Sequence, residues 1–188
     1  MTTRNKELLR TSVLTSIVER CRRPPGRTTL MKFAYILQTV RRVPLGYRFQ
    51  LYNYGPYDEA VLTDLRQAVS SKLLSSKLVT FSGGGYGYEF STGNSLSSAS
   101  EQLSEYVSQF EEDIDWVVNL FGSESAGRME LISTIVFVLC ENGSRLEKPQ
   151  IVQRVNEIKP HFSREVIDAA VDEVSEVLDC VSCGKVDA

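Results

Sequence analysis

The stretch LYNYGPYDEAVLTDL, residues 51–65, joins an aromatic turn to the start of a helix. Gly55-Pro56 forces a turn, and Asp58 stands where a helix N-cap is expected. Beyond it, apolar residues recur at helical spacing, at Val61, Leu62, Leu65, Val69 and Leu73. The stretch predicts a tight turn followed by a helix over residues 58–74.

Two further helices are predicted upstream of this turn. The first covers about residues 6–20 and is stopped by Pro24-Pro25, since proline does not continue a helix. The second has Thr28 or Thr29 as its N-cap and ends before Pro44. A short extended piece over residues 47–52 then leads into the turn.

Downstream of residue 74, two short runs have the composition of β-strands. LVTF (78–81) and YGYEF (86–90) are rich in aromatic and β-branched residues, and a serine and three glycines separate them. They predict a β-hairpin. Three helices followed by a hairpin is the element order of a winged helix-turn-helix, which we expect over residues 1–93.

The remaining residues predict two further helical parts. Residues 94–127 read as a polar connector and one long acidic helix, opened by a capping box at Ser98 and Glu101 and running to Phe121. Residues 128–188 read as a three-helix, helix-turn-helix-like C-terminal unit. Its helices are a buried one in MELISTIVFVLC closed by Asn142-Gly143, one from Pro149, and one capped by Ser163. The expected fold class is mainly α with a small β-hairpin.

Charge divides the chain into two unlike parts. The net charge of the 188 residues is −3, but residues 1–50 hold 11 Lys or Arg against two acids, a net charge of +9, and the rest carries −12. The arginines of the basic part offer a face for an acidic protein or a phosphate backbone. The alternative is that they pair with the chain's own acidic half.

Catalytic, metal and cofactor chemistry find little support in the sequence. The single histidine, His161, lies in an inter-helix turn, and a zinc site needs about four ligands, whereas Cys180 and Cys183 have no second pair. We therefore expect no enzyme activity, no metal and no cofactor. No apolar run approaches the roughly 18 to 20 residues that span a bilayer, and the first residues lack a secretory signal, so we expect no membrane association and a cytoplasmic location.

Three motifs together resemble a known family. TLMKFAYIL (29–37), LYNYGPYDEAVLTDL (51–65) and a glycine-rich hairpin ending in YEFSTG are similar to the Panacea antitoxin-like family and its YwgA-type relatives, over about residues 27–93. The resemblance implies a winged-helix-like prokaryotic protein, often encoded beside toxins or in phages and defence loci. It also implies that the protein works by binding another protein.

The expected function is therefore a non-enzymatic protein-protein interaction module, antitoxin-like or an accessory subunit of a toxin-antitoxin or phage-defence system. Its partner would be a toxin, protease machinery or a defence effector, and the oligomeric state is left open. The candidate contact residues are tyrosines of the turn and arginines of the basic part: Tyr52, Tyr54, Tyr57, Arg22, Arg23, Arg27, Arg41 and Arg42. The tyrosine rings either pack into the core or remain available at the surface, where we expect Tyr54 and Tyr57 to make the contacts.

The alternative function is a DNA-binding winged-helix regulator. Its recognition helix would be the predicted third helix, which carries Asp58, Glu59 and Asp64 against Arg66 and Lys72. The tip of the predicted hairpin, SGGGYG, carries no Lys or Arg. Nucleic acid is therefore the less favoured partner, because both usual contact elements would meet phosphate without net positive charge.

Overall fold

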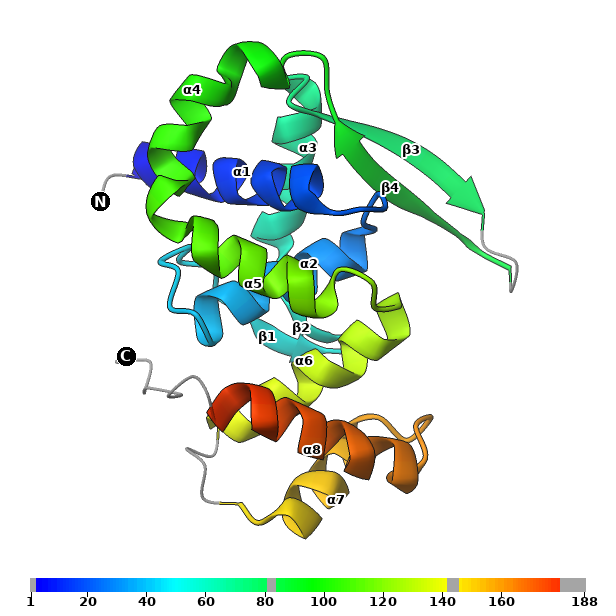
Figure 1. Cartoon of the computed structure of the whole chain (residues 1–188). Coiled ribbons are helices and arrows are strands. Elements are labelled where there is room, and N and C mark those ends of the chain that lie inside the picture. The colour runs from blue at the N-terminus through cyan, green and yellow to red at the C-terminus, as the bar shows by residue number, and fades with distance from the viewer. Residues whose placement is uncertain (1–2, 81–83, 142–145, 180–188) are drawn as a thin grey trace.

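The computed structural model describes residues 3–80, 84–141 and 146–179. The fold is mainly helical with two small antiparallel β-hairpins (Figure 1). Its elements in chain order are α1 (Thr3–Arg20), α2 (Arg27–Thr39), β1 (Gln50–Tyr52), β2 (Gly55–Tyr57), α3 (Glu59–Ser70), β3 (Leu74–Thr80), β4 (Tyr86–Thr92), α4 (Leu96–Val107), a 3-10 turn η1 (Ser108–Phe110), α5 (Glu111–Phe121), α6 (Ala126–Glu141), α7 (Lys148–Ile158) and α8 (Arg164–Asp179).

Helices α1 and α2 form the centre of the core. α1 packs against α3, α4 and α5, and α2 packs against α5, α6 and β2. The helical repeat of Leu9, Val13 and Ile17 buries one face of α1. In α2, every residue from Leu30 to Leu37 is buried, including the charged Lys32, so this helix has neighbours on all sides. α2 begins at Arg27 after Gly26, earlier than the predicted threonine cap.

The predicted long acidic helix is wrong, because the chain bends within it. α4 and α5 are separate helices joined by the 3-10 turn, and α4 begins at Leu96, ahead of the expected capping box. The hydroxyl of Ser98 donates to the carbonyl of Ser95 (2.9 Å) and caps no helix. Val107 of α4 and Ile114 of α5 are both buried, and both helices pack on α1, while α5 also packs on α2.

The sequence predicted one of the two hairpins, β3–β4, but not the other, β1–β2. The β3–β4 hairpin is confirmed and is longer than expected, with Leu74 paired to Thr92 and Thr80 to Tyr86. It ends α3 at Ser70, four residues before the predicted end. The β1–β2 hairpin was expected only as an extended piece and a turn. The Asp58 cap is confirmed, because its carboxylate accepts from the amide of Ala60 (2.9 Å).

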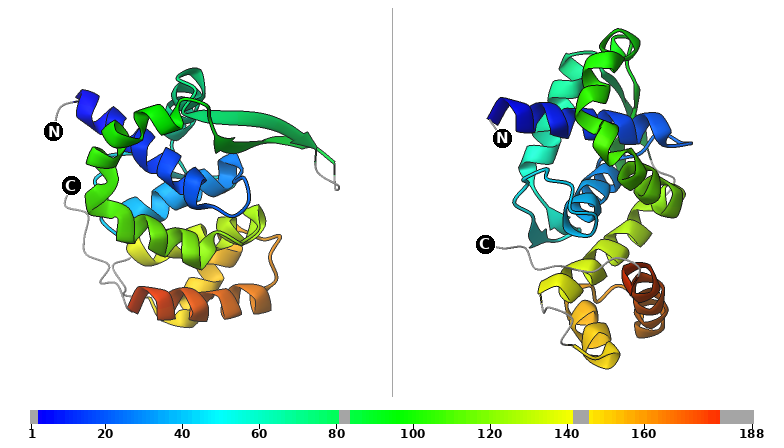
Figure 2. Two further views of the ribbon diagram at one scale, coloured as in Figure 1. Left: turned by 45° about the horizontal axis from the view of Figure 1, so that its top comes forward. Right: turned by 60° about the vertical axis from the view of Figure 1, so that its left-hand side comes forward.

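Helix α6 connects the two ends of the molecule. It packs against α2 and β2 on one side and against α7 and α8 on the other, so that α7 and α8 lie together at one end (Figure 2). α8 is capped as predicted, with the amide of Val166 donating to the hydroxyl of Ser163 (3.4 Å). The predicted stop at Asn142-Gly143 lies outside the described residues.

Candidate functional site

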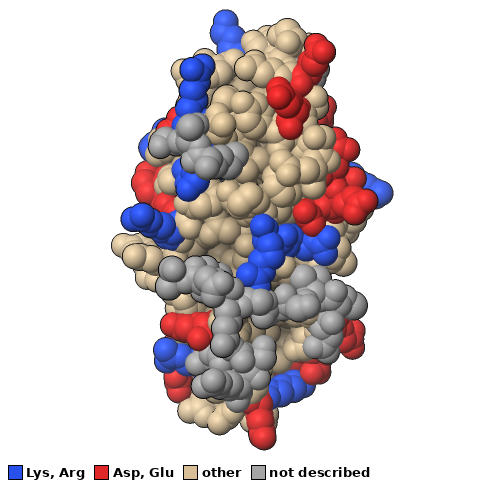
Figure 3. Space-filling view, turned by 90° about the vertical axis from the view of Figure 1, so that its left-hand side faces the viewer, with Lys and Arg blue, Asp and Glu red and all other residues tan. Residues whose placement is uncertain are grey.

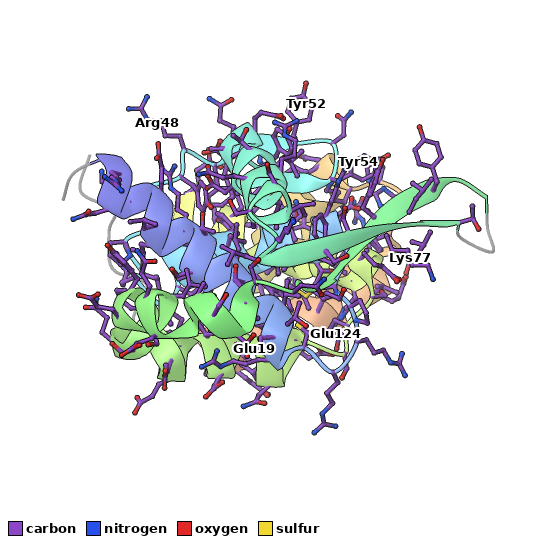
Figure 4. The ribbon with its side chains drawn as sticks, turned by 90° about the horizontal axis from the view of Figure 1, so that it is seen from above. Glu19, Arg48, Tyr52, Tyr54, Lys77 and Glu124 are labelled. Carbon is purple, nitrogen blue, oxygen red and sulfur yellow. The ribbon has the colours of Figure 1, made fainter. Side chains whose placement is uncertain are left out.

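The β1–β2 hairpin, residues 50–57, is called the tyrosine hairpin below. Two of its three tyrosines are exposed at the surface, Tyr52 by 65% and Tyr54 by 70% (Figure 4). Tyr57 is half-buried, packs its ring 5.7 Å from that of Tyr52, and donates its hydroxyl proton to the carboxylate of Glu59, which raises the pKa of Tyr57. The exposed tyrosines of the hairpin are therefore Tyr52 and Tyr54, whereas Tyr57, which was expected to make contacts together with Tyr54, is half-buried.

Gly55 lets the tyrosine hairpin approach α6 closely. Its φ of 86° lies in the left-handed region, which L side chains rarely adopt. A Cβ atom at this position would stand 3.0 Å from Oγ1 of Thr134 and 3.2 Å from Oγ of Ser133. Both the conformation and the space therefore require glycine, and the hairpin rests directly on α6.

A cluster of buried charged side chains holds the hairpin from below. Nζ of Lys32 donates to the carbonyl of Pro56 (2.7 Å), and Nζ of Lys159 donates to the carbonyl of Asn53. Lys159 also pairs with Glu130 on α6, with 2.7 Å between Nζ and Oε1. The two lysines are 2% and 1% exposed and Glu130 is 7% exposed. Lysine ammonium groups thus satisfy two of the hairpin's carbonyl oxygens, which would otherwise be costly to bury.

The surroundings of Lys32 disfavour its charge. Burial and, to a smaller extent, the charge of Lys159 lower the pKa of Lys32 to about 8, against the opposing effect of Glu130. His161 stands beside the cluster, with its Nε2 3.6 Å from Oε1 of Glu130, and is itself exposed in its turn, as predicted. Lys32 is therefore mainly protonated at neutral pH, but a small rise in pH removes its proton.

Sequence reasoning missed this cluster, although one signal was present. Lys32 interrupts the apolar run TLMKFAYIL, and Glu130 interrupts MELISTIVFVLC. A charged residue inside a run predicted to be buried needs a partner. Periodicity could not show that the partners of these two residues are the hairpin carbonyls and Lys159, because the contacts are long-range.

A cavity of about 300 Å³ opens beside the hairpin. It is lined by Lys32 and by five residues of the hairpin: Tyr52, Asn53, Tyr54, Gly55 and Tyr57. Because Lys32 is buried and the rings of Tyr52 and Tyr54 are exposed, the lysine lies at the inner end and the two rings at the mouth.

The arginines that follow α1 lie beside the other hairpin. Arg22 and Arg23 are exposed in the connection from α1 to α2, which pairs with β4: the amide of Phe90 donates to the carbonyl of Pro25 (3.0 Å). The guanidinium of Arg27 stacks on the ring of Tyr88 at 3.9 Å from its centroid. These three arginines are therefore neighbours of the β3–β4 hairpin and not of the tyrosine hairpin.

The arginines that follow α2, Arg41 and Arg42, lie on a different surface from Arg22, Arg23 and Arg27. Nε of Arg41 pairs with Asp113 on α5 (2.6 Å), and its guanidinium lies over the ring of Trp116 at 5.1 Å. Arg42 is exposed at a φ of 62°. A helix of 13 residues separates the two groups by about 20 Å. The candidate arginines thus occupy two surfaces, not one.

Internal pairing, the alternative considered for the basic part, accounts for some of its charge. Besides Arg41, Arg20 pairs with Asp115 (2.8 Å between Nε and Oδ1) on α5. On the face drawn in Figure 3, basic and acidic residues are interspersed, with no single sign covering the surface. Acidic residues of α5 therefore pair with Arg20, the last residue of α1, and with Arg41, which follows α2.

The acidic residues of α3 are also partly internal. Asp64 is buried and accepts a hydrogen bond from the hydroxyl of Tyr47 (2.7 Å), and burial raises the pKa of both groups. Asp58 caps the helix, and Glu59 pairs with Arg66 (3.2 Å). The exposed side of α3 therefore carries less negative charge than the sequence indicated.

Other reactive groups are few in the described part of the chain. Burial raises the pKa of the Cys21 thiol to about 11, which keeps it protonated and unreactive. Among residues 3–80, 84–141 and 146–179, no three His, Cys, Asp or Glu side chains gather to hold a metal ion. Cys180 and Cys183 lie outside these ranges.

Comparison with known proteins returns no relative: no family model matches the chain, and no curated protein is significantly similar to it. None of the helices that the structure describes is long and apolar enough to cross a membrane.

Proposed function

We propose that this chain is a non-enzymatic protein-binding module that contacts its partner through the tyrosine hairpin. The observation that carries the proposal is the pair of exposed rings, Tyr52 and Tyr54, on a hairpin fixed from below by Gly55 and the buried lysines. Tyrosine is enriched at binding hot spots, and a rigid platform lowers the entropy lost on association.

The proposed fold of the N-terminal part is winged-helix-like. The order α1, α2, α3 followed by the β3–β4 hairpin supports it, as does the packing of α3 on α1 and of the hairpin strands on α1 and α3. Together with the family resemblance, this supports an antitoxin-like role or an accessory role in a toxin-antitoxin or phage-defence system. The partner would then be a toxin, protease machinery or a defence effector.

Affinity capture tests the proposal. The tagged chain is used to capture partners from its native lysate with and without nuclease, as wild type and as the Tyr52→Ala/Tyr54→Ala double variant. We expect one stoichiometric protein that survives nuclease and is lost, at least tenfold, in the double variant. The matched control is Tyr86→Ala, which removes a 74% exposed tyrosine from the other hairpin and should retain capture. Equal capture by the double variant contradicts the proposal.

DNA binding is the second candidate, favoured by a different observation. Arg22 and Arg23 stand next to the β3–β4 hairpin, and Arg27 and Arg66 together line a groove of about 160 Å³ between α3 and that hairpin. The proposal predicts duplex affinity that falls steeply with salt and is lost in the Arg22→Ala/Arg23→Ala/Arg27→Ala variant, but not in Arg48→Ala. Salt-independent or absent binding excludes this candidate.

A further inference from the structure

The buried charges beneath the tyrosine hairpin do not balance. Lys32 and Lys159 are two ammonium groups, and within the described residues Glu130 is the one carboxylate in contact with them. His161, whose Nε2 lies 3.6 Å from Oε1 of Glu130, is exposed to solvent and lies at the edge of the buried cluster. The cluster therefore holds an excess of one positive charge in surroundings that solvate charge poorly, a situation that an additional anion relieves.

Lys32 is the lysine of the cluster that lines the cavity. Lys159 is engaged by both Glu130 and the carbonyl of Asn53, whereas Lys32 donates only to the carbonyl of Pro56 among the described acceptors. An ammonium has three N–H donors, so Lys32 retains donors for a second acceptor. Lys32 also lines the cavity of about 300 Å³ whose mouth is formed by Tyr52 and Tyr54.

We infer that this cavity binds a single carboxylate of the partner protein, an Asp or Glu side chain or a chain terminus, with Lys32 pairing to its oxygens and the rings of Tyr52 and Tyr54 packing around its carbon chain. The inference rests on the proposed function and deepens it, since it names the chemical group that the tyrosine hairpin recognises.

A carboxylate fits the site better than a phosphate does. One monoanion restores neutrality to a cluster with one excess positive charge, whereas a phosphate group carries about −1.5 to −2 at neutral pH. The cavity lining offers one cation and no arginine for the further phosphate oxygens. The volume accommodates a carboxylate together with several carbon atoms of the chain that carries it.

The test uses small carboxylates on the full chain, followed by NMR of the hairpin amides and the Lys32 side chain. N-acetylglycine presents a chain-terminal carboxylate, and N-acetylaspartate N-methylamide presents a side-chain carboxylate. N-acetylglycinamide is the neutral control and methyl phosphate the dianionic one. We expect saturable shifts of the amides of Asn53, Tyr54, Gly55 and Tyr57 with at least one carboxylate, at a Kd at least tenfold below that of either control. The tighter of the two carboxylates identifies the source.

Two further measurements connect binding to Lys32. Raising the pH from 7 to 9 should weaken the carboxylate by about tenfold as the ammonium loses its proton. The other titratable groups around Lys32 and the cavity are Glu130, Lys159, His161, Tyr52, Tyr54 and Tyr57. Lys32→Met should abolish the shifts, and Lys77→Met, which removes an exposed lysine of β3, should leave them unchanged.

The outcomes separate this inference from the proposed function. Equal binding of N-acetylglycinamide, tighter binding of methyl phosphate, shifts confined to other residues, or no shift at all would each overturn the carboxylate site. If Lys32→Met does not fold, the pH dependence of the wild type decides, and its absence overturns the site. Loss of partner capture in the Tyr52→Ala/Tyr54→Ala variant with no carboxylate binding leaves the function standing and removes only the inference.

Discussion

The two β-hairpins present exposed tyrosines in contrasting ways. The tyrosine hairpin is short and rests on α6, with its carbonyl groups bound by two buried lysines. The β3–β4 hairpin is longer and extends away from the body of the molecule, with Tyr86 near its outer end (Figure 1). An exposed ring on a fixed support and one on an extended arm carry different entropic costs on binding, and this favours the shorter hairpin as the contact surface.

The largest expected difference between the hairpins concerns two lysines, Lys159 beneath the tyrosine hairpin and Lys77 on β3. Lys159→Met leaves the buried carboxylate of Glu130 without its ion pair and should lower the free energy of unfolding by about 3–5 kcal/mol. Lys77→Met on β3, where Lys77 lies opposite Glu89 at the surface, should cost less than about 0.5 kcal/mol. Urea unfolding measures both, and similar losses for the two variants would show that the cluster does not fix the tyrosine hairpin.

A glycine in each hairpin has a positive φ, but the two glycines differ in what surrounds them. Gly55→Ala adds a Cβ atom at a left-handed backbone position and places it against side chains of α6. We therefore expect the free energy of unfolding to fall by about 2–4 kcal/mol. Gly84→Ala in the other hairpin has the same backbone sign, φ 87°, but open space around it, so about 1 kcal/mol is expected. Equal losses in denaturant unfolding would mean that contact with α6 contributes nothing.

The pH dependence of stability tests the buried ammonium. The pKa of Lys32 falls from 10.5 in the unfolded chain to about 8 when folded, so above pH 8 the unfolded chain binds more protons and stability rises with pH. Between pH 8 and 9 we expect a gain of about 1 kcal/mol relative to Lys32→Met. Above pH 9 the Cys21 thiol, with its pKa raised from 9.0 to about 11, acts in the opposite direction. A flat difference between wild type and variant from pH 8 to 9 contradicts the assignment.

The smallest expected effect on stability is that of the exposed rings. Tyr52→Ala and Tyr86→Ala should each change the free energy of unfolding by less than about 0.5 kcal/mol, because both side chains are largely exposed in the isolated chain. Thermal unfolding of the two variants checks this. A clear loss for Tyr52→Ala alone would assign its ring, which packs 5.7 Å from that of Tyr57, a structural role in the hairpin.

The sequence predicted the helices and the longer hairpin because their signals are local. Apolar spacing in α1, the Asp58 cap of α3 and the aromatic runs of β3 and β4 each act within a few residues. The bend between α4 and α5 was missed, since it follows from packing on α1 and α2 and not from any breaker at residues 108–110. Three-residue strands such as β1 and β2 are too short to show an alternating pattern.

The candidate site was predictable in part. The aromatic turn predicted the three tyrosines as candidates and favoured Tyr54 and Tyr57, but the hydroxyl of Tyr57 donates to Glu59 and its ring is half-buried, whereas Tyr52 and Tyr54 are exposed. The joining of Lys32, Glu130 and Lys159 depends on α6 and the turn after α7 reaching the hairpin. Only tertiary structure brings such distant positions together.

The contact between Lys159 and the carbonyl of Asn53 spans 106 residues of sequence. On a ribosome that adds about 5–20 residues per second, roughly 5–20 seconds separate the synthesis of the two partners. Until then the turn of the tyrosine hairpin lacks one of its two ammonium donors. Nascent chains that end before Lys159 therefore lack this contact, and the support of the tyrosine hairpin is completed only after translation has passed the end of α7.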